Sequence, residues 1–203
     1  MQVLKDEIRE QILEASLRKF AEKGFKKTTM ADIAKAAGLS VGNLYRYYKN
    51  KEHIFSSIIT PGDIEQLISL FTRKIQSTHG IPLEEAGQNP DHLLANDEII
   101  DFYCENRLRL IVALENVEET SYSGVKGKIL DNLVSLFYQY LRSIGKEEAI
   151  SDPGLRILIR TIYINLTNGI LGLLRSTDNK EILRQGLHHL LTYHLYGLSG
   201  FTR

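Results

Sequence analysis

The sequence predicts an all-α protein with about nine helices, and three observations support this prediction. Apolar residues recur with the helical period in nearly every segment of the 203-residue chain. No stretch of strand length alternates cleanly between apolar and polar residues. Near the N-terminus, two short helical segments meet across a tight turn that contains a glycine, which is the pattern of a helix-turn-helix. We therefore expect a three-helix helix-turn-helix domain over residues 1–50 and a larger helical domain over residues 51–203.

The first helix is expected over about 5–23. Its apolar residues, Ile12 and Phe20 among them, fall within one arc of about 140° on a helical wheel. Gly24 is expected to end this helix, and Phe25 is placed to pack back on it.

The helix-turn-helix is expected over about 29–48. Thr29 can cap a short helix, about 30–37, and Asp32 three residues later can complete a capping box. Gly38 supplies a left-handed turn at the end of that helix. Ser40 can then cap the third helix.

A fourth helix is expected from Asn50 or Lys51 to about Ile59, and the sequence Thr60-Pro61-Gly62-Asp63 predicts a break and a new helix start. Residues 79–91 contain two prolines and two glycines and predict one long loop. The later helices are expected over about 93–116, 124–144, 154–175 and 179–198.

The last two helices, about 154–175 and 179–198, are apolar around more than half of their circumference. A helix pair at the end of a small protein cannot bury that much apolar surface on one side, so a second subunit is the simplest partner. Gly169 and Gly172 would allow close helix approach. The alternative is that both helices simply wrap the core of the monomer.

The most apolar region, 155–174, is interrupted by Arg156, Arg160, Asn165 and Asn168, which favours a buried helix over a membrane span. The N-terminal residues lack the apolar run of a signal peptide, so we expect a cytoplasmic protein. One cysteine, Cys104, leaves no intramolecular disulfide and no cysteine-rich zinc site.

Positive charge is concentrated at the N-terminal end. The formal net charge is zero, but residues 1–60 carry 11 Lys and Arg against 7 Asp and Glu, whereas residues 61–203 carry 14 against 18. Within 40–51, SVGNLYRYYKNK, three tyrosines and three basic residues occur without one acid. The alternatives at this point are a surface for a polyanion and an ordinary solvated basic face with tyrosines packed beneath it.

A helical wheel divides this segment into an inner and an outer face. Leu44 and Tyr48 point inward, while the outer arc carries side chains that can reach DNA. Arginine can pair with guanine and asparagine with adenine, an aromatic ring can touch a thymine methyl, and a glycine permits close approach of the helix to the duplex. Val41 has nearly the wheel angle of Tyr48, so a core role and a base contact are both open for it. We expect DNA binding by Thr29, Ser40, Val41, Gly42, Asn43, Tyr45, Arg46, Tyr47, Lys49 and Lys51, with Thr29, Tyr47 and Lys51 on phosphates.

The run ILEASLRKFAEKGFKKTTMADIAKAAGLSVGNLYRYYKNKEHIF, residues 12–55, resembles the DNA-binding domain of the tetracycline-repressor (TetR) family of bacterial transcriptional regulators. Tyr47 and Tyr48 depart from the histidine and phenylalanine that are usual there. The resemblance implies a homodimer on a pseudo-palindromic double-stranded operator, joined through the last two helices. It also implies a divergent helical domain that binds a small molecule, and a fourth helix that moves when the ligand binds.

Polar residues among apolar ones in the later helices are the candidates for an effector pocket: Tyr103, Arg107, Tyr163, Asn165 and Asn168. The leading interpretation is a repressor released from its operator by a small molecule. The alternative is a regulator of the same architecture controlled by a protein partner or by the arrangement of the DNA. No catalytic motif and no pair of histidines at metal-ligand spacing occurs, so we expect neither an enzyme nor a metal or other cofactor.

Overall fold

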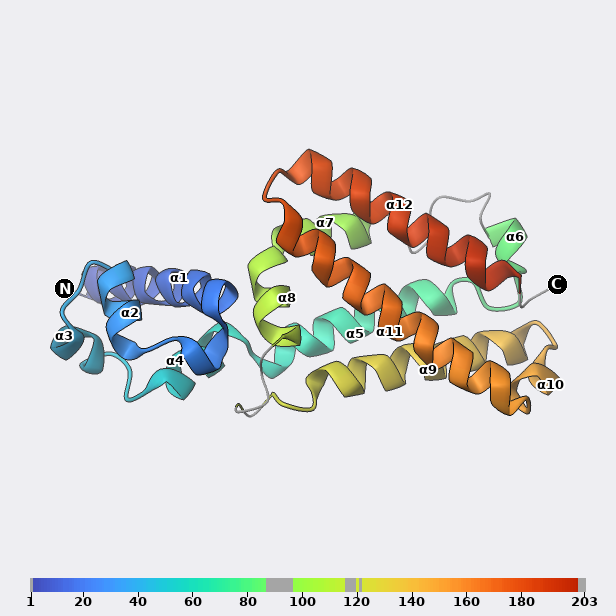
Figure 1. Ribbon diagram of the computed structural model, residues 1–203, viewed down its shortest axis with the longest axis horizontal. Coiled ribbons are helices and arrows are strands. Elements are labelled where there is room, and N and C mark those ends of the chain that lie inside the picture. The colour runs from blue at the N-terminus through green and yellow to red at the C-terminus, as the bar shows by residue number, and fades with distance from the viewer. Residues whose placement is uncertain (1, 87–96, 116–119, 121, 201–203) are drawn as a thin grey trace. The chain divides into compact units, whose positions relative to one another are not determined.

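The computed structural model describes residues 2–86, 97–115, 120 and 122–200, and these residues form helices and no strand. The predicted all-α class is confirmed (Figure 1). The helices are α1 (Gln2–Lys27), α2 (Met30–Ala36), α3 (Val41–Tyr45), α4 (Lys51–Ile58), α5 (Pro61–Gln76), α6 (Leu83–Ala86), α7 (Asp97–Glu105), α8 (Arg107–Leu114), α9 (Val125–Ser143), α10 (Glu147–Ile150), α11 (Pro153–Ser176) and α12 (Lys180–Ser199).

Three differences account for the larger number of helical segments. Two four-residue helices, α6 and α10, were not predicted, and α6 lies within the expected loop over 79–91. The helix expected over 93–116 is interrupted at Asn106, whose side-chain amide donates to the carbonyl of Phe102 at 3.0 Å. Asparagine favours such local bonds to the backbone over a regular helix, which explains the separation of α7 from α8.

The chain divides into two compact units. The N-terminal unit contains Met1–Asp63 and Leu108–Val125, and the C-terminal unit contains Ile64–Arg107 and Lys126–Arg203. Packing thus groups α4 and most of α8 with the helix-turn-helix. The boundary after residue 50 that we expected between DNA-binding and regulatory functions stays a prediction.

Three aromatic rings form the core that joins α1 to α4 in the N-terminal unit. The centroid of Phe25 lies 5.6 Å from that of Phe20 and 5.2 Å from that of Phe55. Gly24 has a φ of 77°, which interrupts α1 and directs Phe25 back onto Phe20 as predicted. Phe55 in turn lies 5.7 Å from Tyr122, so the segment after α8 shares this aromatic cluster.

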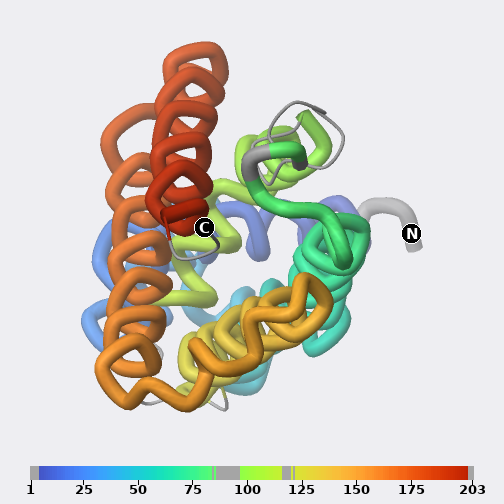
Figure 2. The backbone as a smooth tube through the Cα atoms, turned by 90° about the vertical axis from the view of Figure 1, so that its right-hand side faces the viewer, coloured from blue at the N-terminus to red at the C-terminus, as the bar shows by residue number. Residues whose placement is uncertain are grey.

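In the C-terminal unit, α11 and α12 lie side by side (Figure 2). Each helix offers a glycine to a leucine of the other: a Cβ on Gly169 would lie 3.1 Å from Leu190, and one on Gly186 would lie 3.0 Å from Leu173. Gly169 therefore permits the close approach that the sequence predicted. Gly172 does not serve this contact, because a Cβ there would meet nothing within 4 Å.

Helix α11 is less buried than we expected. It is the one described helix that is long and apolar enough to cross a membrane by length and composition, and only 33% of its most apolar window is buried. Ile157 is 70% exposed, and Leu158 and Ile164 are also exposed. The prediction of a buried helix was therefore wrong for the outward face, because in the single chain α11 packs mainly along one side, against α12.

Candidate nucleic-acid interface

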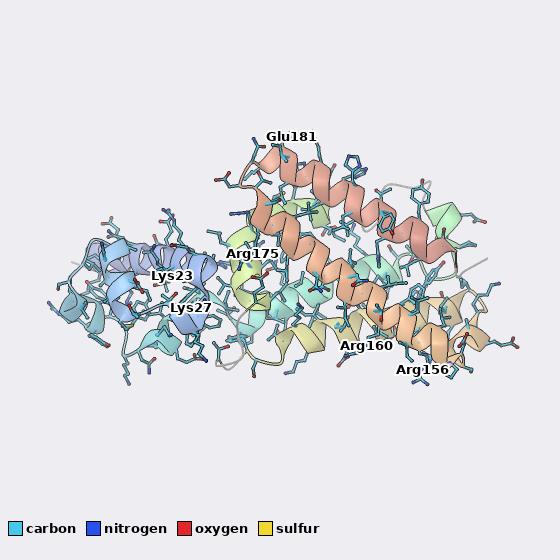
Figure 3. The ribbon with its side chains drawn as sticks, viewed as in Figure 1. Lys23, Lys27, Arg156, Arg160, Arg175 and Glu181 are labelled. Carbon is cyan, nitrogen blue, oxygen red and sulfur yellow. The ribbon has the colours of Figure 1, made fainter. Side chains whose placement is uncertain are left out.

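The first helix of the helix-turn-helix begins at a capping box. The hydroxyl of Thr29 accepts from the backbone amide of Asp32 at 3.1 Å, and the Asp32 carboxylate accepts from both the amide and the hydroxyl of Thr29. Lys23 of α1, labelled in Figure 3, donates to the same carboxylate at 3.0 Å. The hydrogen bond from the Thr29 backbone, followed by that from Lys23, lowers the pKa of Asp32 to about 2. The predicted cap is confirmed, and it also joins α2 to α1.

The turn after α2 is a Schellman motif. Gly38 has a φ of 64°, its amide donates to the carbonyl of Lys35, and the amide of Leu39 donates to the carbonyl of Ala34. The Gln11 side chain donates to the carbonyl of Ala37 at 2.9 Å, which holds the turn against α1. This geometry fixes the direction in which the next helix starts.

Helix α3 is capped by Ser40, whose hydroxyl accepts from the amide of Asn43 at 3.2 Å. Leu44 is fully buried and Tyr48 is buried, as the wheel predicted. The ring of Tyr48 lies 5.2 Å from that of His53, so the end of this segment is packed against α4. Burial raises the pKa of the Tyr48 phenol.

The residues of this segment that are exposed or, for Asn43, half-buried are together called the recognition face: Val41, Gly42, Asn43, Tyr45, Arg46 and Lys49. Val41 is 40% exposed, which excludes the core role that the sequence left open for it. A Cβ on Gly42 would meet nothing within 4 Å, so this glycine serves no contact inside the protein. Position 42 therefore has no side chain, while its neighbours carry a guanidinium, a carboxamide and a phenol. A helix that reads base edges in a groove needs such side chains and a backbone that can approach the DNA closely.

The residues expected on phosphates lie in three different environments. Both hydrogen-bond donors of Thr29, its amide and its hydroxyl, are engaged with Asp32. Tyr47 is half-buried beside the recognition face. The ammonium of Lys51 donates to the carbonyl of Phe25 at 2.5 Å and reaches that of Lys26 at 3.4 Å. A role for these residues in DNA binding stays a prediction.

Helix α4 is anchored in the N-terminal unit through its apolar face. Ile54 and Phe55 are fully buried, and Ile58 is buried. The next helix starts at a second capping box, in which the Asp63 carboxylate accepts from the amide of Thr60 at 2.7 Å. The other oxygen of Asp63 lies 3.3 Å from Arg109 of α8, which ties the beginning of α5 to α8 within this unit.

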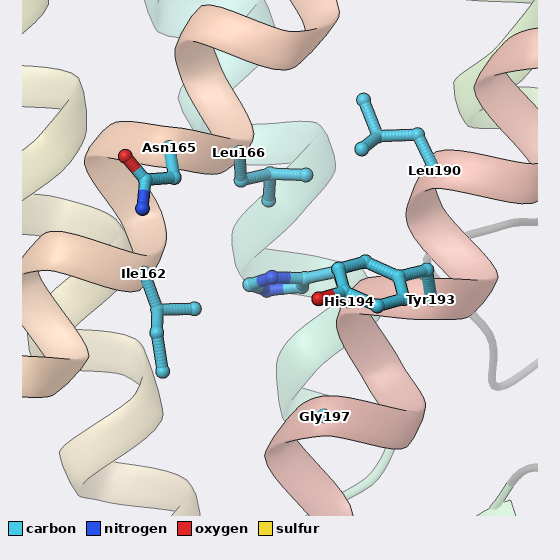
Figure 4. Close-up of a pocket in the computed structure, with 7 residues that line it drawn as sticks. All are labelled: Ile162, Asn165, Leu166, Leu190, Tyr193, His194 and Gly197. Atoms are coloured by element: carbon cyan, nitrogen blue, oxygen red, sulfur yellow. The ribbon is translucent and has the colours of Figure 1, made fainter.

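A pocket of about 330 Å³ opens on the face of the α11–α12 pair (Figure 4). His194 lines it and is itself buried, with its ring 5.2 Å from that of Tyr163. Burial lowers the pKa of His194 to about 4, so the imidazole is neutral at physiological pH. The pocket is lined by Ile162, Asn165, Leu166, Leu190, Tyr193, His194 and Gly197.

The three effector candidates on α11 do not lie on one side of that helix. Tyr163 points into the core, whereas Asn165 and Asn168 are exposed, because positions two and five residues along a helix lie on the opposite side. Asn165 is the one candidate that lines the described pocket, and Asn168 accepts from Lys126 at 3.0 Å.

The other two candidates, Tyr103 in α7 and Arg107 at the start of α8, also have distinct environments. Tyr103 is a core residue whose ring packs 6.2 Å from that of Phe71, and burial raises its pKa well above the usual value. The Nε of Arg107 is buried and has no hydrogen-bond partner among the described residues. An effector site formed by these residues stays a prediction.

Metal ligands do not gather in the described parts of the chain: no three His, Cys, Asp or Glu side chains there could hold an ion. Among the histidines, His92 lies outside the described residues. Cys104 is buried, and burial raises the pKa of its thiol, which disfavours the reactive thiolate.

Part of the chain, including the helix-turn-helix, is similar in sequence to known proteins. Residues 12–58 match the sequence profile of bacterial regulatory proteins of the tetR family. The HTH-type transcriptional regulator YhgD of Bacillus subtilis is 45% identical over 49 residues, which cover 24% of this chain and 26% of that protein. The HTH-type transcriptional repressor KstR2 of Mycolicibacterium smegmatis is 29% identical over 79 residues, 36% of this chain and 38% of that protein. The chain thus matches less than half the length of either relative.

The fold has a counterpart along most of the chain. A crystal structure of a TetR-like transcriptional regulator from Rhodococcus sp. RHA1 aligns with 95% of this chain and 96% of its own, with a TM-score of 0.56 and 23% sequence identity. At this identity the likeness concerns the fold alone.

Proposed function

We propose that the chain is a DNA-binding transcriptional regulator of the TetR family, and that it acts as a homodimeric repressor, released from a pseudo-palindromic operator by a small molecule. The observation that supports DNA recognition best is the recognition face. It is exposed, carries no acid, and projects from a segment whose inner residues, Leu44 and Tyr48, are buried. Such a helix fits the major groove, where base edges can be read.

Within the proposed interface, two groups of side chains have different tasks. Asn43, Tyr45 and Arg46 would contact base edges, with Gly42 allowing the backbone to approach and Val41 offering an apolar contact. Ser40, Tyr47 and Lys49 stand at its margins, where a hydroxyl or an ammonium can donate to a phosphate. Thr29 could reach a phosphate only by giving up a bond of its capping box, so its main effect would be to position α2.

A second copy of the chain would bind through the outward faces of α11 and α12. On α11 the exposed positions Ile157, Thr161, Ile164 and Asn168 follow the helical period. On α12 the corresponding stripe includes Ile182, His189, Tyr193 and Tyr196. Gly172 and Gly197 lie open on this side and would permit close approach of a partner helix.

The two-fold symmetry of the proposed dimer constrains the spacing of the half-sites in its operator. One recognition face per subunit reads one half-site, so the half-sites should be about one helical turn of DNA, or a multiple of it, apart. The operator would therefore be a pseudo-palindrome.

Control by a ligand is proposed from the family resemblance and from one feature of the C-terminal unit. The buried Nε of Arg107 lacks a partner among the described residues, and an anionic group of an effector would satisfy it. Binding would act on the N-terminal unit through α8, which the Asp63–Arg109 ion pair joins to the beginning of α5. We place the regulator in the cytoplasm, where its DNA target is, and propose no cofactor for it.

One experiment tests the proposal. Purified protein is footprinted on the DNA upstream of its own gene, alone and with a panel of candidate ligands that includes anionic and neutral compounds. Protection of a pseudo-palindrome, released by one compound, is the expected result. Protection that no compound alters would favour the alternative, control by a protein partner or by the DNA arrangement, and the lack of any protected sequence there or in a random-sequence selection would refute DNA recognition.

A further inference from the structure

The link between α3 and α4 is held by one residue of α4, His53. The backbone amides of Arg46, Tyr47 and Tyr48 still donate to carbonyls of α3, at 3.0 to 3.1 Å. The next amide, that of Lys49, donates instead to Nδ1 of the His53 ring at 3.4 Å. The His53 side chain thus supplies a hydrogen-bond acceptor at the point where the backbone hydrogen bonds of α3 end.

His53 also contacts both neighbours of Lys49. Its ring meets the ring of Tyr48 edge to face, with 5.2 Å between the centroids and 66° between the planes. Its backbone amide donates to the side-chain oxygen of Asn50, the N-cap of α4, at 2.8 Å. Three consecutive residues of the link, 48–50, are therefore bonded to His53 or packed against it. Each such contact contributes modestly, so the three together hold the link more firmly than any one of them.

The residues that follow His53 fix α4 in the core of the N-terminal unit. Ile54 and Phe55 are fully buried, and the Phe55 ring lies 5.2 Å from that of Phe25 near the end of α1. His53 itself is exposed. It therefore connects the recognition face, which includes Lys49, to a helix whose apolar side is anchored in the aromatic core.

The hydrogen bond to Lys49 also determines which nitrogen of the His53 ring carries the proton. Because Nδ1 accepts from a backbone amide, the proton of the neutral imidazole is on Nε2. In this form the side chain is an acceptor for the link and brings no positive charge to the DNA. Arg46 and Lys49, in contrast, are exposed cations of the recognition face.

We propose that His53 is a positioning residue that fixes the recognition face to α4 and thereby contributes to operator specificity. Reading base edges requires side chains that are held to within about 0.5 Å, whereas attraction to phosphates depends on charge and tolerates looser placement. Loosening the link should therefore weaken binding to the operator more than binding to unrelated DNA. This inference rests on the proposed DNA-binding function, and one part of its test does not require DNA.

Three variants of the full-length protein separate the two contacts of the imidazole. His53→Phe keeps a ring beside Tyr48 and removes the acceptor. His53→Asn keeps an acceptor close to the position of Nδ1 and removes the ring, and His53→Ala removes both. His188→Ala is the matched control, because His188 is an exposed imidazole of α12 that also contacts a neighbouring ring, that of His189, at 6.1 Å between centroids.

The first measurement is amide hydrogen exchange of the free protein, followed by NMR. Without its acceptor, the Lys49 amide should exchange about 3- to 10-fold faster in His53→Phe and His53→Ala, which is the range expected for the loss of one hydrogen bond. In His53→Asn and in His188→Ala its exchange rate should stay within about 2-fold of the wild type, because the acceptor is retained.

The second measurement compares the affinity for the operator found by footprinting with that for a random-sequence duplex, at one salt concentration. In His53→Ala the ratio of the two affinities should fall by about 10- to 100-fold, because a loss of about 3- to 10-fold occurs in each subunit of the proposed dimer. Affinity for the random duplex should stay within about 2-fold of the wild type. His53→Phe and His53→Asn should lie between the wild type and His53→Ala, and either serves if the alanine variant does not fold.

The outcomes separate the positioning role from the proposed function. An unchanged affinity ratio in His53→Ala would overturn the positioning role, and so would an equal loss on both duplexes, which a direct phosphate contact would produce. Wild-type exchange of the Lys49 amide in both His53→Phe and His53→Ala would overturn it as well. If the wild-type protein prefers no DNA sequence, the proposed function fails, and the exchange of the Lys49 amide still decides whether His53 holds the link.

Discussion

Replacing Gly42 by alanine should make the protein more stable and a weaker DNA binder. Gly42 lies in the first turn of α3, it is not among the glycines with positive φ, and a Cβ there would meet nothing within 4 Å. Alanine therefore fits without strain and reduces the conformational freedom of the unfolded chain. The gain is about 0.4 to 1 kcal/mol in the free energy of unfolding. For a chain of this size the Tm should rise by about 1 to 4 °C.

Operator affinity, in contrast to stability, is expected to fall in Gly42→Ala. If the backbone at Gly42 approaches the bases, an added methyl group must be accommodated in a packed interface, at a cost of about 1 to 3 kcal/mol. The dissociation constant for the operator should rise by about 5- to 150-fold. Fluorescence anisotropy with a labelled operator measures this change, at a fixed salt concentration because the phosphate contacts depend on salt.

Gly127→Ala is the matched control. Gly127 is an exposed glycine in α9, and a Cβ there also meets nothing within 4 Å. This variant should gain stability to a similar extent and bind the operator as the wild type does. Operator affinity of Gly42→Ala equal to that of Gly127→Ala would refute the close approach of α3 to DNA.

Three further predictions address the interface, the assembly and the pH dependence. Arg46→Ala should relax base preference at one position per half-site, at a cost of about 1 to 3 kcal/mol, while Lys49→Ala should weaken all sequences alike; binding to a set of single-base operator variants distinguishes them. The wild type should elute as a dimer without DNA, and Tyr193→Asp, which places a charge on the α11–α12 face, should shift it toward monomer in light scattering at micromolar concentration. Burial lowers the pKa of His194 from 6.5 to about 4. As the pH falls, the imidazole is therefore protonated in the unfolded chain at a higher pH than in the folded protein. Between pH 7 and pH 4 the free energy of unfolding of the wild type should therefore fall by about 3 kcal/mol more than that of His194→Phe. Urea denaturation at the two pH values measures this difference.

Local chemistry made the helix-turn-helix predictable. The capping box of Thr29 and Asp32 and the left-handed Gly38 depend on residues within four positions of each other, so the sequence contains all that determines them. Val41 was ambiguous for a physical reason. Its wheel angle matches that of Tyr48 only on a continuous helix, but α3 ends at Tyr45, and Tyr48 follows its C-cap. Because Val41 and Tyr48 are not on one continuous helix, Val41 can be exposed while Tyr48 is buried.

Contacts between residues distant in the sequence could not be predicted. Lys51 binds carbonyls 25 and 26 residues earlier, and no periodic pattern in the sequence specifies such a pair. The effector candidates on α11 lie on opposite sides of that helix for a related reason. They were chosen as polar residues among apolar ones, and this criterion selects both Tyr163, whose ring completes the core, and Asn165, which lies on the outward side.

Three kinds of partner could cover the exposed face of α11: lipid, an effector, or a second copy of the chain. Lipid is disfavoured because the outward positions include Thr161, Asn165 and Asn168, which would lose hydrogen bonds to water in a bilayer. An effector in the 330 Å³ pocket would cover its lining but leave Ile157 and Ile182, which are not among the lining residues, in water. A second α11–α12 pair would cover the whole stripe at once, and the mixture of apolar and polar residues in the stripe is typical of subunit interfaces. The same partner would fill the pocket beside Tyr193, which is 77% exposed in the single chain, so an effector of the proposed regulator should be sought elsewhere in the C-terminal unit.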